Sequence, residues 1–127
     1  MDSIISKETY NLFKDLILFE VFYYDEMILK VPQINTNIYF DRAEAEHIIN
    51  HTHLDEYFDY QKFSRNDFSD ITKLLFYRLK ALYPDKKVIV YLLFDDDNKP
   101  ILDFGLYREG EMLYYDTNSL NIEYYMS

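Results

Sequence analysis

Residues 88–108 have the sequence VIVYLLFDDDNKPILDFGLYR, in which two apolar runs flank a short polar segment. Turn-forming Asp, Asn and Pro between two such runs predict a β-hairpin with its turn at 95–100. The first run is apolar on both faces, which is typical of a strand in the centre of a sheet. The second alternates, so we expect Leu102 and Phe104 to face the core and Asp103 to face away from it.

A second turn is predicted at Glu109-Gly110, with further strands over 111–116 and 122–126. A two-residue turn would place the Tyr114 ring over the bare backbone of Gly105 on the preceding strand. Because glutamate is a poor residue for the positive φ of such a turn, a longer loop with a bulge is the alternative. These strands form an antiparallel meander.

Two helices are predicted in the first half of the chain. One runs over residues 6–19, where apolar side chains follow helical spacing. The other begins at Asp41, a favourable N-cap, and Glu44 stands three residues on, as in a capping box. The sequence over 16–31 loses this periodicity and fits either a continued helix or a hairpin that turns at Asp25-Glu26.

A third helix is predicted over 68–82 from its apolar stripe, with Ser64 or Ser69 as N-cap and Pro84 ending it. The fold class is therefore α+β, with N-terminal helices packed on one face of a C-terminal antiparallel β-meander of three to four strands. The chain has 127 residues, 49% of them hydrophobic, and no cysteine. We expect a single compact acidic domain over 1–127 without disulfides.

Net charge, glycine content and the length of apolar runs exclude several classes of function. The chain carries 13 basic and 23 acidic residues, a formal net charge of −10, whereas direct binding of nucleic acid needs clustered Lys and Arg. Its two glycines, Gly105 and Gly110, are too few for a phosphate-binding loop or a dinucleotide fingerprint. The N-terminus does not resemble a secretory signal and no apolar run has membrane-spanning length, so we expect a cytoplasmic protein without membrane association.

All three histidines, His47, His51 and His53, fall within seven residues. The first two are four apart on a predicted helix, which places both imidazoles on one face, as zinc sites require. The chain has no His-Glu-x-x-His motif, and histidines near a helix C-terminus also complement the helix dipole without a metal. We therefore predict no metal or cofactor, and the three histidines remain the candidate ligands of the alternative, an enzyme.

A surface of tyrosines and acids is the predicted site of partner binding. Tyrosine offers a large, rigid contact area, and carboxylates complement a basic partner. The acidic turn at 95–97 adds a local negative potential, and it lacks the ligand spacing of an EF-hand loop. The predicted binding residues are Asp95, Asp96, Asp97, Asp103, Tyr107, Glu109, Glu111, Tyr114 and Asp116. The alternative is that these tyrosines pack beneath the N-terminal segment.

The sequence lacks the motifs of nucleophilic catalysis, since it has no cysteine and no Gly-x-Ser-x-Gly turn. We expect a binding protein, not an enzyme, that neutralises a basic protein partner, most simply an immunity protein or antitoxin blocking a toxin such as a nuclease. In size and acidity the chain is similar to bacterial immunity proteins. The alternatives are a phage-type inhibitor that mimics nucleic acid, a secretion chaperone, and a small metal-dependent enzyme that uses the three histidines. The chaperone is disfavoured because the chain ends in strand-like alternation instead of an amphipathic helix.

Overall fold

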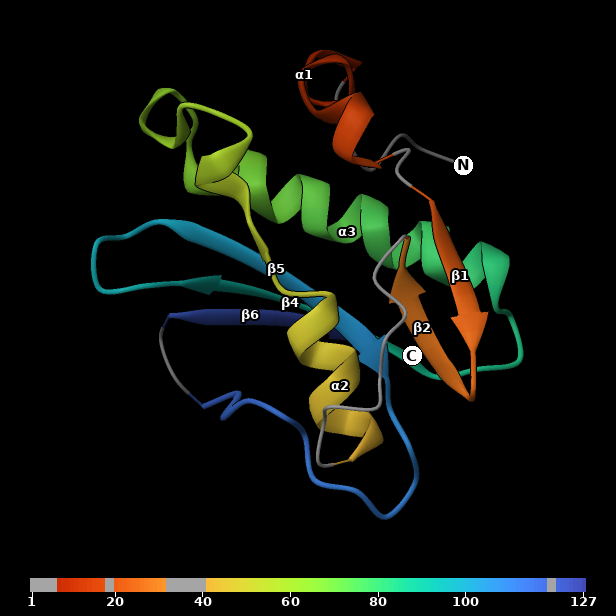
Figure 1. Ribbon diagram of the computed structural model, residues 1–127. Coiled ribbons are helices and arrows are strands. Elements are labelled where there is room, and N and C mark those ends of the chain that lie inside the picture. The colour runs from red at the N-terminus through yellow and green to blue at the C-terminus, as the bar shows by residue number, and fades with distance from the viewer. Residues whose placement is uncertain (1–6, 18–19, 32–40, 119–120) are drawn as a thin grey trace.

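The elements of the fold alternate between helices and strands along the chain (Figure 1). The computed structural model describes residues 7–17, 20–31, 41–118 and 121–127. The elements are α1 (Lys7–Ile17), β1 (Val21–Tyr24), β2 (Met27–Lys30), α2 (Arg42–Ile49), β3 (Thr52–His53), the 3-10 turns η1 (Leu54–Glu56) and η2 (Tyr60–Lys62), α3 (Arg65–Leu82), β4 (Val88–Phe94), β5 (Pro100–Leu106) and β6 (Ile122–Met126). The predicted α+β class is confirmed, although the order of helices and strands is interleaved.

The strands form two antiparallel sheets. One is the β1–β2 hairpin, and the other has four strands in the order β3-β5-β4-β6. The strand β4 is therefore central, as its two apolar faces predict. Within 16–31, the hairpin is confirmed and the continued helix is wrong: Asp25 and Glu26 have φ of 47° and 60°, as a two-residue type I′ turn requires.

The helices begin where their capping residues predict. Asp41 precedes α2, and its side chain accepts a hydrogen bond from the backbone N–H of Glu44 at 2.8 Å. Ser64, and not Ser69, caps α3 through a reciprocal capping box with Asp67. The helix α1 covers 7–17 of the predicted 6–19; residues 6 and 18–19 lie outside the described residues.

The main hydrophobic core lies between α3 and one face of the four-stranded sheet. Apolar side chains of α3, such as Ile71 and Leu75, pack with Val90 of β4 and with Leu102 and Phe104 of β5. Burying these side chains is the main source of stability in a domain of this size. The inward orientation of alternate β5 residues is therefore confirmed.

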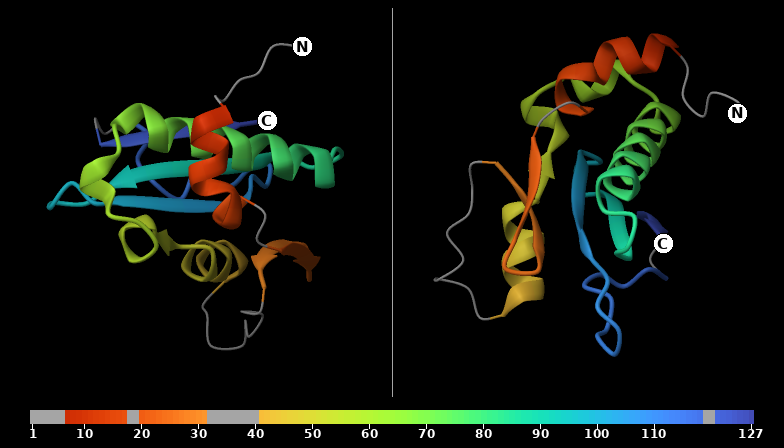
Figure 2. Two further views of the ribbon diagram at one scale, coloured as in Figure 1. Left: turned by 90° about the horizontal axis from the view of Figure 1, so that it is seen from above. Right: turned by 90° about the vertical axis from the view of Figure 1, so that its right-hand side faces the viewer.

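A second helix covers the other face of the same sheet. Figure 2 shows α3 on one side of the sheet, with α2 and the β1–β2 hairpin on the opposite side. Between α2 and β2 lies a smaller apolar cluster of Met27, Leu29, Ala45 and Ile49. Helices thus flank both faces of the sheet instead of the single face that we expected.

The predicted strand over 111–116 is wrong. A turn does form at the expected place, because the N–H of Glu111 donates to the carbonyl of Arg108 at 3.0 Å. The segment then continues without pairing to a strand, and Tyr115 contacts Asp103 and Tyr91 on the second face of the sheet. The physical reason is that β5 has no free edge: β4 occupies one side, and β3 together with side chains of α2 occupies the other.

Candidate functional site

A fully buried carboxylate on α2 anchors the second face of the sheet. The side chain of Glu46 accepts hydrogen bonds from the backbone N–H groups of Ile28 at 2.9 Å and Leu106 at 2.8 Å. The guanidinium of Arg108 donates to the same carboxylate at 3.2 and 3.4 Å. Burial raises the pKa of Glu46 above its usual 4.5, while Arg108 and the two backbone donors act in the opposite direction.

One helical turn further on, Asn50 completes the bridge between the two sheets. Its amide nitrogen donates to the carbonyls of Ile28 at 2.6 Å and Phe104 at 2.9 Å, and its amide oxygen accepts from the N–H of Lys30 at 2.9 Å. Asn50 and Glu46 therefore satisfy backbone groups that a neighbouring strand would otherwise pair. Two side chains of α2 take the place of a strand between β2 and β5.

A second buried cluster is centred on Asp103 of β5. Its carboxylate oxygens lie 2.8 Å from Nδ1 of His47 and 3.3 Å from Nδ1 of His51, and the Tyr115 hydroxyl donates to it at 2.5 Å. Burial raises the pKa of Tyr115, and the charge of Asp103 raises it further, so the phenol stays protonated and donates. Asp103 is 0% exposed, so its predicted place on a partner-binding surface is wrong. Alternation identified its face correctly, but α2 and residues 111–118 cover that face.

The three histidines serve different contacts. His47 and His51 both contact Asp103, whereas Nδ1 of His53 lies 3.9 Å from a carboxylate oxygen of Asp55. Among the described residues, no group of three or more His, Cys, Asp or Glu is arranged to hold a metal ion. The contacts that the structure gives to His47 and His51 tie α2 to the sheet.

Apolar and acidic side chains gather where α2 meets the segment that follows Arg108. Met112 is 93% exposed and Tyr114 is 43% exposed, and the Tyr114 ring stacks on His47 with centroids 4.5 Å apart. Burial raises the pKa of Tyr114, and the charges of Asp103, Glu44 and Asp41 raise it further. Asp41 and Glu44 are the N-cap and a first-turn acid of α2, the helix that carries His47. We define the acidic–aromatic patch as Asp41, Glu44, Glu111, Met112 and Tyr114.

The structure separates the other predicted binding residues. Asp95, Asp96 and Asp97 form the β4–β5 turn, at the opposite end of these strands from Glu111 and about 20 Å away along β5. Asp95 is used structurally there, because its side chain accepts from the N–H groups of Asp97 and Lys99, both at 2.9 Å. Asp96 and Asp97 are exposed.

The remaining predicted residues flank the patch. Glu109 is exposed in the turn beside it, and Asp116 is exposed with its carboxylate accepting from the N–H of Asn118 at 3.0 Å. Tyr107 lines both a small cavity beneath the patch and a groove beside the β1–β2 hairpin. The predicted binding residues did not include Met112, although the predicted strand pairing places it on the same face as Tyr114. They did not include Asp41 or Glu44 either, although the capping pattern places both acids at the start of α2.

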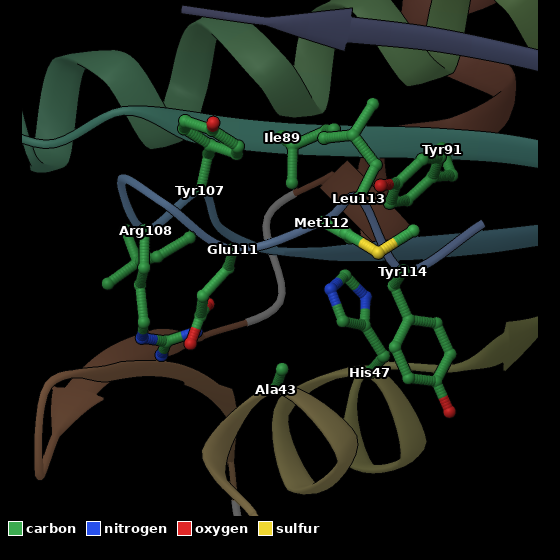
Figure 3. A pocket seen from close by; sticks show the side chains of 11 residues that line it. Ala43, His47, Ile89, Tyr91, Tyr107, Arg108, Glu111, Met112, Leu113 and Tyr114 are labelled. Atoms are coloured by element: carbon green, nitrogen blue, oxygen red, sulfur yellow. The ribbon is translucent and has the colours of Figure 1, made fainter. Parts of the chain in front are cut away.

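Beneath the patch lies a cavity of about 10 Å³ between α2 and the sheet (Figure 3). This volume holds about one water molecule. The Tyr91 hydroxyl borders the cavity and has no partner in hydrogen-bond geometry among the described residues, and burial raises its pKa to about 12. The cavity has no room for a substrate, so what the patch offers is its outer surface.

Comparisons with known proteins place the chain in a family. No helix among the described residues combines the length and the apolar character needed to cross a bilayer. No curated protein and no solved structure matches the chain. One family model, described as Uncharacterized protein PM0498 family, matches residues 2–126. Since this match covers nearly the whole sequence, the chain belongs to the PM0498 family.

Proposed function

We propose that this chain is a small acidic cytoplasmic protein that binds and neutralises a basic protein partner, as an immunity protein or antitoxin does with a toxin such as a nuclease. One observation carries the proposal. In the acidic–aromatic patch, the 93% exposed Met112 and the 43% exposed Tyr114 line the same small cavity as Glu111, and Glu44 lies in the first turn of the adjoining helix α2.

This combination suits protein recognition. Binding energy at protein interfaces concentrates in a few buried aromatic and apolar side chains, and surrounding charges set the association rate and the choice of partner. A net charge of −10 attracts basic proteins over long range. Nucleases are basic around their substrate sites because nucleic acids are polyanions, so they fit this surface.

The tyrosine of the patch is held in place before any partner arrives. Tyr114 stacks on the buried His47, and its neighbour Tyr115 donates to the buried Asp103. Side chains that are already ordered lose less entropy on binding than mobile ones. This rigidity supports a tight, specific complex.

The test begins by identifying the partner and continues with binding kinetics. A tagged chain is expressed in its own host, and a basic protein that co-purifies in stoichiometric amount is identified by mass spectrometry. Association is then measured for Glu44→Lys/Glu111→Lys and for a matched control, Asp96→Lys/Asp97→Lys, which carries the same net charge. We expect the patch variant to slow association by about tenfold or more at low salt, with a smaller effect at high salt.

Two results would contradict the proposal. One is the absence of any stoichiometric basic partner. The other is equal slowing in the two variants, since net charge alone would then explain the effect. Tyr114→Ala adds an independent check, because truncating an interface ring raises the dissociation rate more than it lowers the association rate.

A further inference from the structure

A groove of about 190 Å³ lies at the seam between the β1–β2 hairpin and the four-stranded sheet. The connection between α3 and β4 passes beside the hairpin turn there, as Figure 1 shows. The groove is lined by Tyr23, Glu26, Lys86, Lys87, Leu106, Tyr107 and Arg108. We propose that this groove binds a small phosphate monoester, a role that is independent of the acidic–aromatic patch.

Three cationic side chains converge on the groove in a protein whose net charge is −10. Lys86 and Lys87 come from the α3–β4 connection, and Arg108 follows β5. Within the described part of the chain, no carboxylate lies within 4.0 Å of either lysine ammonium. The charges of the two lysines are therefore available to an anion.

Aromatic rings position the two lysines. The Lys86 ammonium lies 5.4 Å from the centre of the Tyr23 ring, and the Lys87 ammonium lies 5.9 Å from the centre of the Tyr107 ring. Such contacts hold a cation without neutralising it. The same rings, with Leu106 between the sheet and the hairpin, supply apolar surface for the organic part of a ligand.

The groove is preformed. The backbone N–H of Tyr107 donates to the carbonyl of Lys87 at 2.8 Å, and the Lys80 ammonium donates to the carbonyl of Lys86 at 2.9 Å. Arg108 is held by the buried Glu46 and donates to the carbonyl of Glu26 at 2.9 Å. The backbone that carries all three cations is thus fixed before a ligand binds, which lowers the entropy cost of binding.

The size and charge of the groove define the ligand. Its volume of about 190 Å³ is far larger than the one-water cavity beneath the patch and has room for one phosphate group with a small organic body. A phosphate dianion accepts several charge-assisted hydrogen bonds at once, which suits the two ammonium groups. The guanidinium of Arg108 is already paired with Glu46 and Glu111, so the two lysines supply the charge for the ligand. The strongly negative remainder of the surface repels a nucleic acid polyanion, so a single phosphate on a small organic body fits best.

Phenyl phosphate is the probe for this proposal. Its titration into the full-length ¹⁵N-labelled protein is followed by NMR, and inorganic phosphate and phenol are titrated in parallel. We expect saturable shifts concentrated at the backbone amides of Lys86, Lys87, Tyr107 and Arg108. Lys86→Gln/Lys87→Gln should weaken binding by about tenfold or more, since two charge-assisted contacts are lost.

The matched control is Lys7→Gln/Lys62→Gln, which removes the same charge from two exposed lysines outside the groove. It should bind the probe as the wild type does. Equal weakening in both double variants, or no saturable shifts up to about 10 mM probe, would overturn the proposal. Tight binding of phenol, or inorganic phosphate binding as well as phenyl phosphate, would also overturn it, because either the anion or the organic body would then contribute nothing.

Discussion

Replacing Gly105 with alanine tests the packing of α2 on the sheet. A Cβ at this position would lie 2.4 Å from Oε1 of Glu46 and 2.7 Å from its carboxyl carbon, whereas real Cβ contacts essentially never fall below 3.0 Å. Glu46 cannot give way cheaply, because its carboxylate is buried and holds the N–H groups of Ile28 and Leu106. The added methyl group must therefore displace a side chain that satisfies two backbone donors.

The expected cost follows from two contributions. Overpacking a well-filled site costs about 1–3 kcal/mol. Losing one hydrogen bond to a charged group costs about 1.5–3 kcal/mol more. We expect Gly105→Ala to lower the free energy of unfolding by about 3–5 kcal/mol, a large fraction of the stability of a small domain.

Urea denaturation followed by circular dichroism measures this loss. Gly110→Ala is the matched control: its φ of 84° strains an alanine, but nothing lies within 4 Å of the added Cβ, so we expect a loss of only about 1 kcal/mol. In a Glu46→Ala background the cost of Gly105→Ala should fall below about 1 kcal/mol, because the clashing atoms are gone. A small loss in the wild-type background, or additive losses in the double variant, would refute the reasoning.

Two further substitutions test the buried polar groups. Tyr115→Phe should lower the free energy of unfolding by about 1.5–3 kcal/mol, because Asp103 loses the hydroxyl that donates to it. The control Tyr114→Phe, at a 43% exposed residue, should change the free energy of unfolding little. Equal effects of the two substitutions would contradict this assignment. Glu46→Gln should be destabilising, since its amide NH₂ confronts a backbone N–H. Burial raises the pKa of Glu46 in the folded state above its usual 4.5. The contribution of Glu46 to the free energy of unfolding is therefore fully present below about pH 4.5 and declines as the pH rises. The stability difference between wild type and Glu46→Gln should accordingly narrow from about pH 4.5 to about pH 7. Denaturation at several pH values checks this, and a difference that widens with pH would show that the pKa is lowered.

Local signals were sufficient to predict the elements that depend on short-range rules. The capping box at Ser64 and the apolar stripe that follows it define α3 wherever the helix packs. The two apolar faces of β4 require cover on both sides, which indicates a central strand. These elements set the fold class.

The pairing of strands depends on the rest of the chain, and here the local pattern predicted a strand over 111–116 that does not form. The alternation of residues 111–116 is the same whether the segment joins a sheet or crosses over it. Only the occupied edges of β5 decide between the two, and α2 occupies one of them through Glu46 and Asn50. A charged residue on a helix of an acidic protein predicts a solvated face, so nothing in the local pattern indicated that Glu46 is buried.

The candidate site could be predicted only in part, because its arrangement also depends on how distant segments pack. Glu111 and Tyr114 lie together in the patch, because they are close in sequence. Asp103 alternates away from the main core as expected, but local alternation does not show whether solvent or a second helix covers that face. Only the packing of α2 answers that question.

The bridge that Glu46 and Asn50 form has a consequence for the behaviour of the protein in concentrated solution. Wherever α2 detaches, β2 and the last half of β5 expose unpaired N–H and C=O groups that a strand from another molecule can pair. A docked helix that caps open strand edges is thus a barrier to aggregation as well as a structural element. Resistance to aggregation therefore depends on the two polar side chains that keep α2 docked over these edges, as well as on the high net charge.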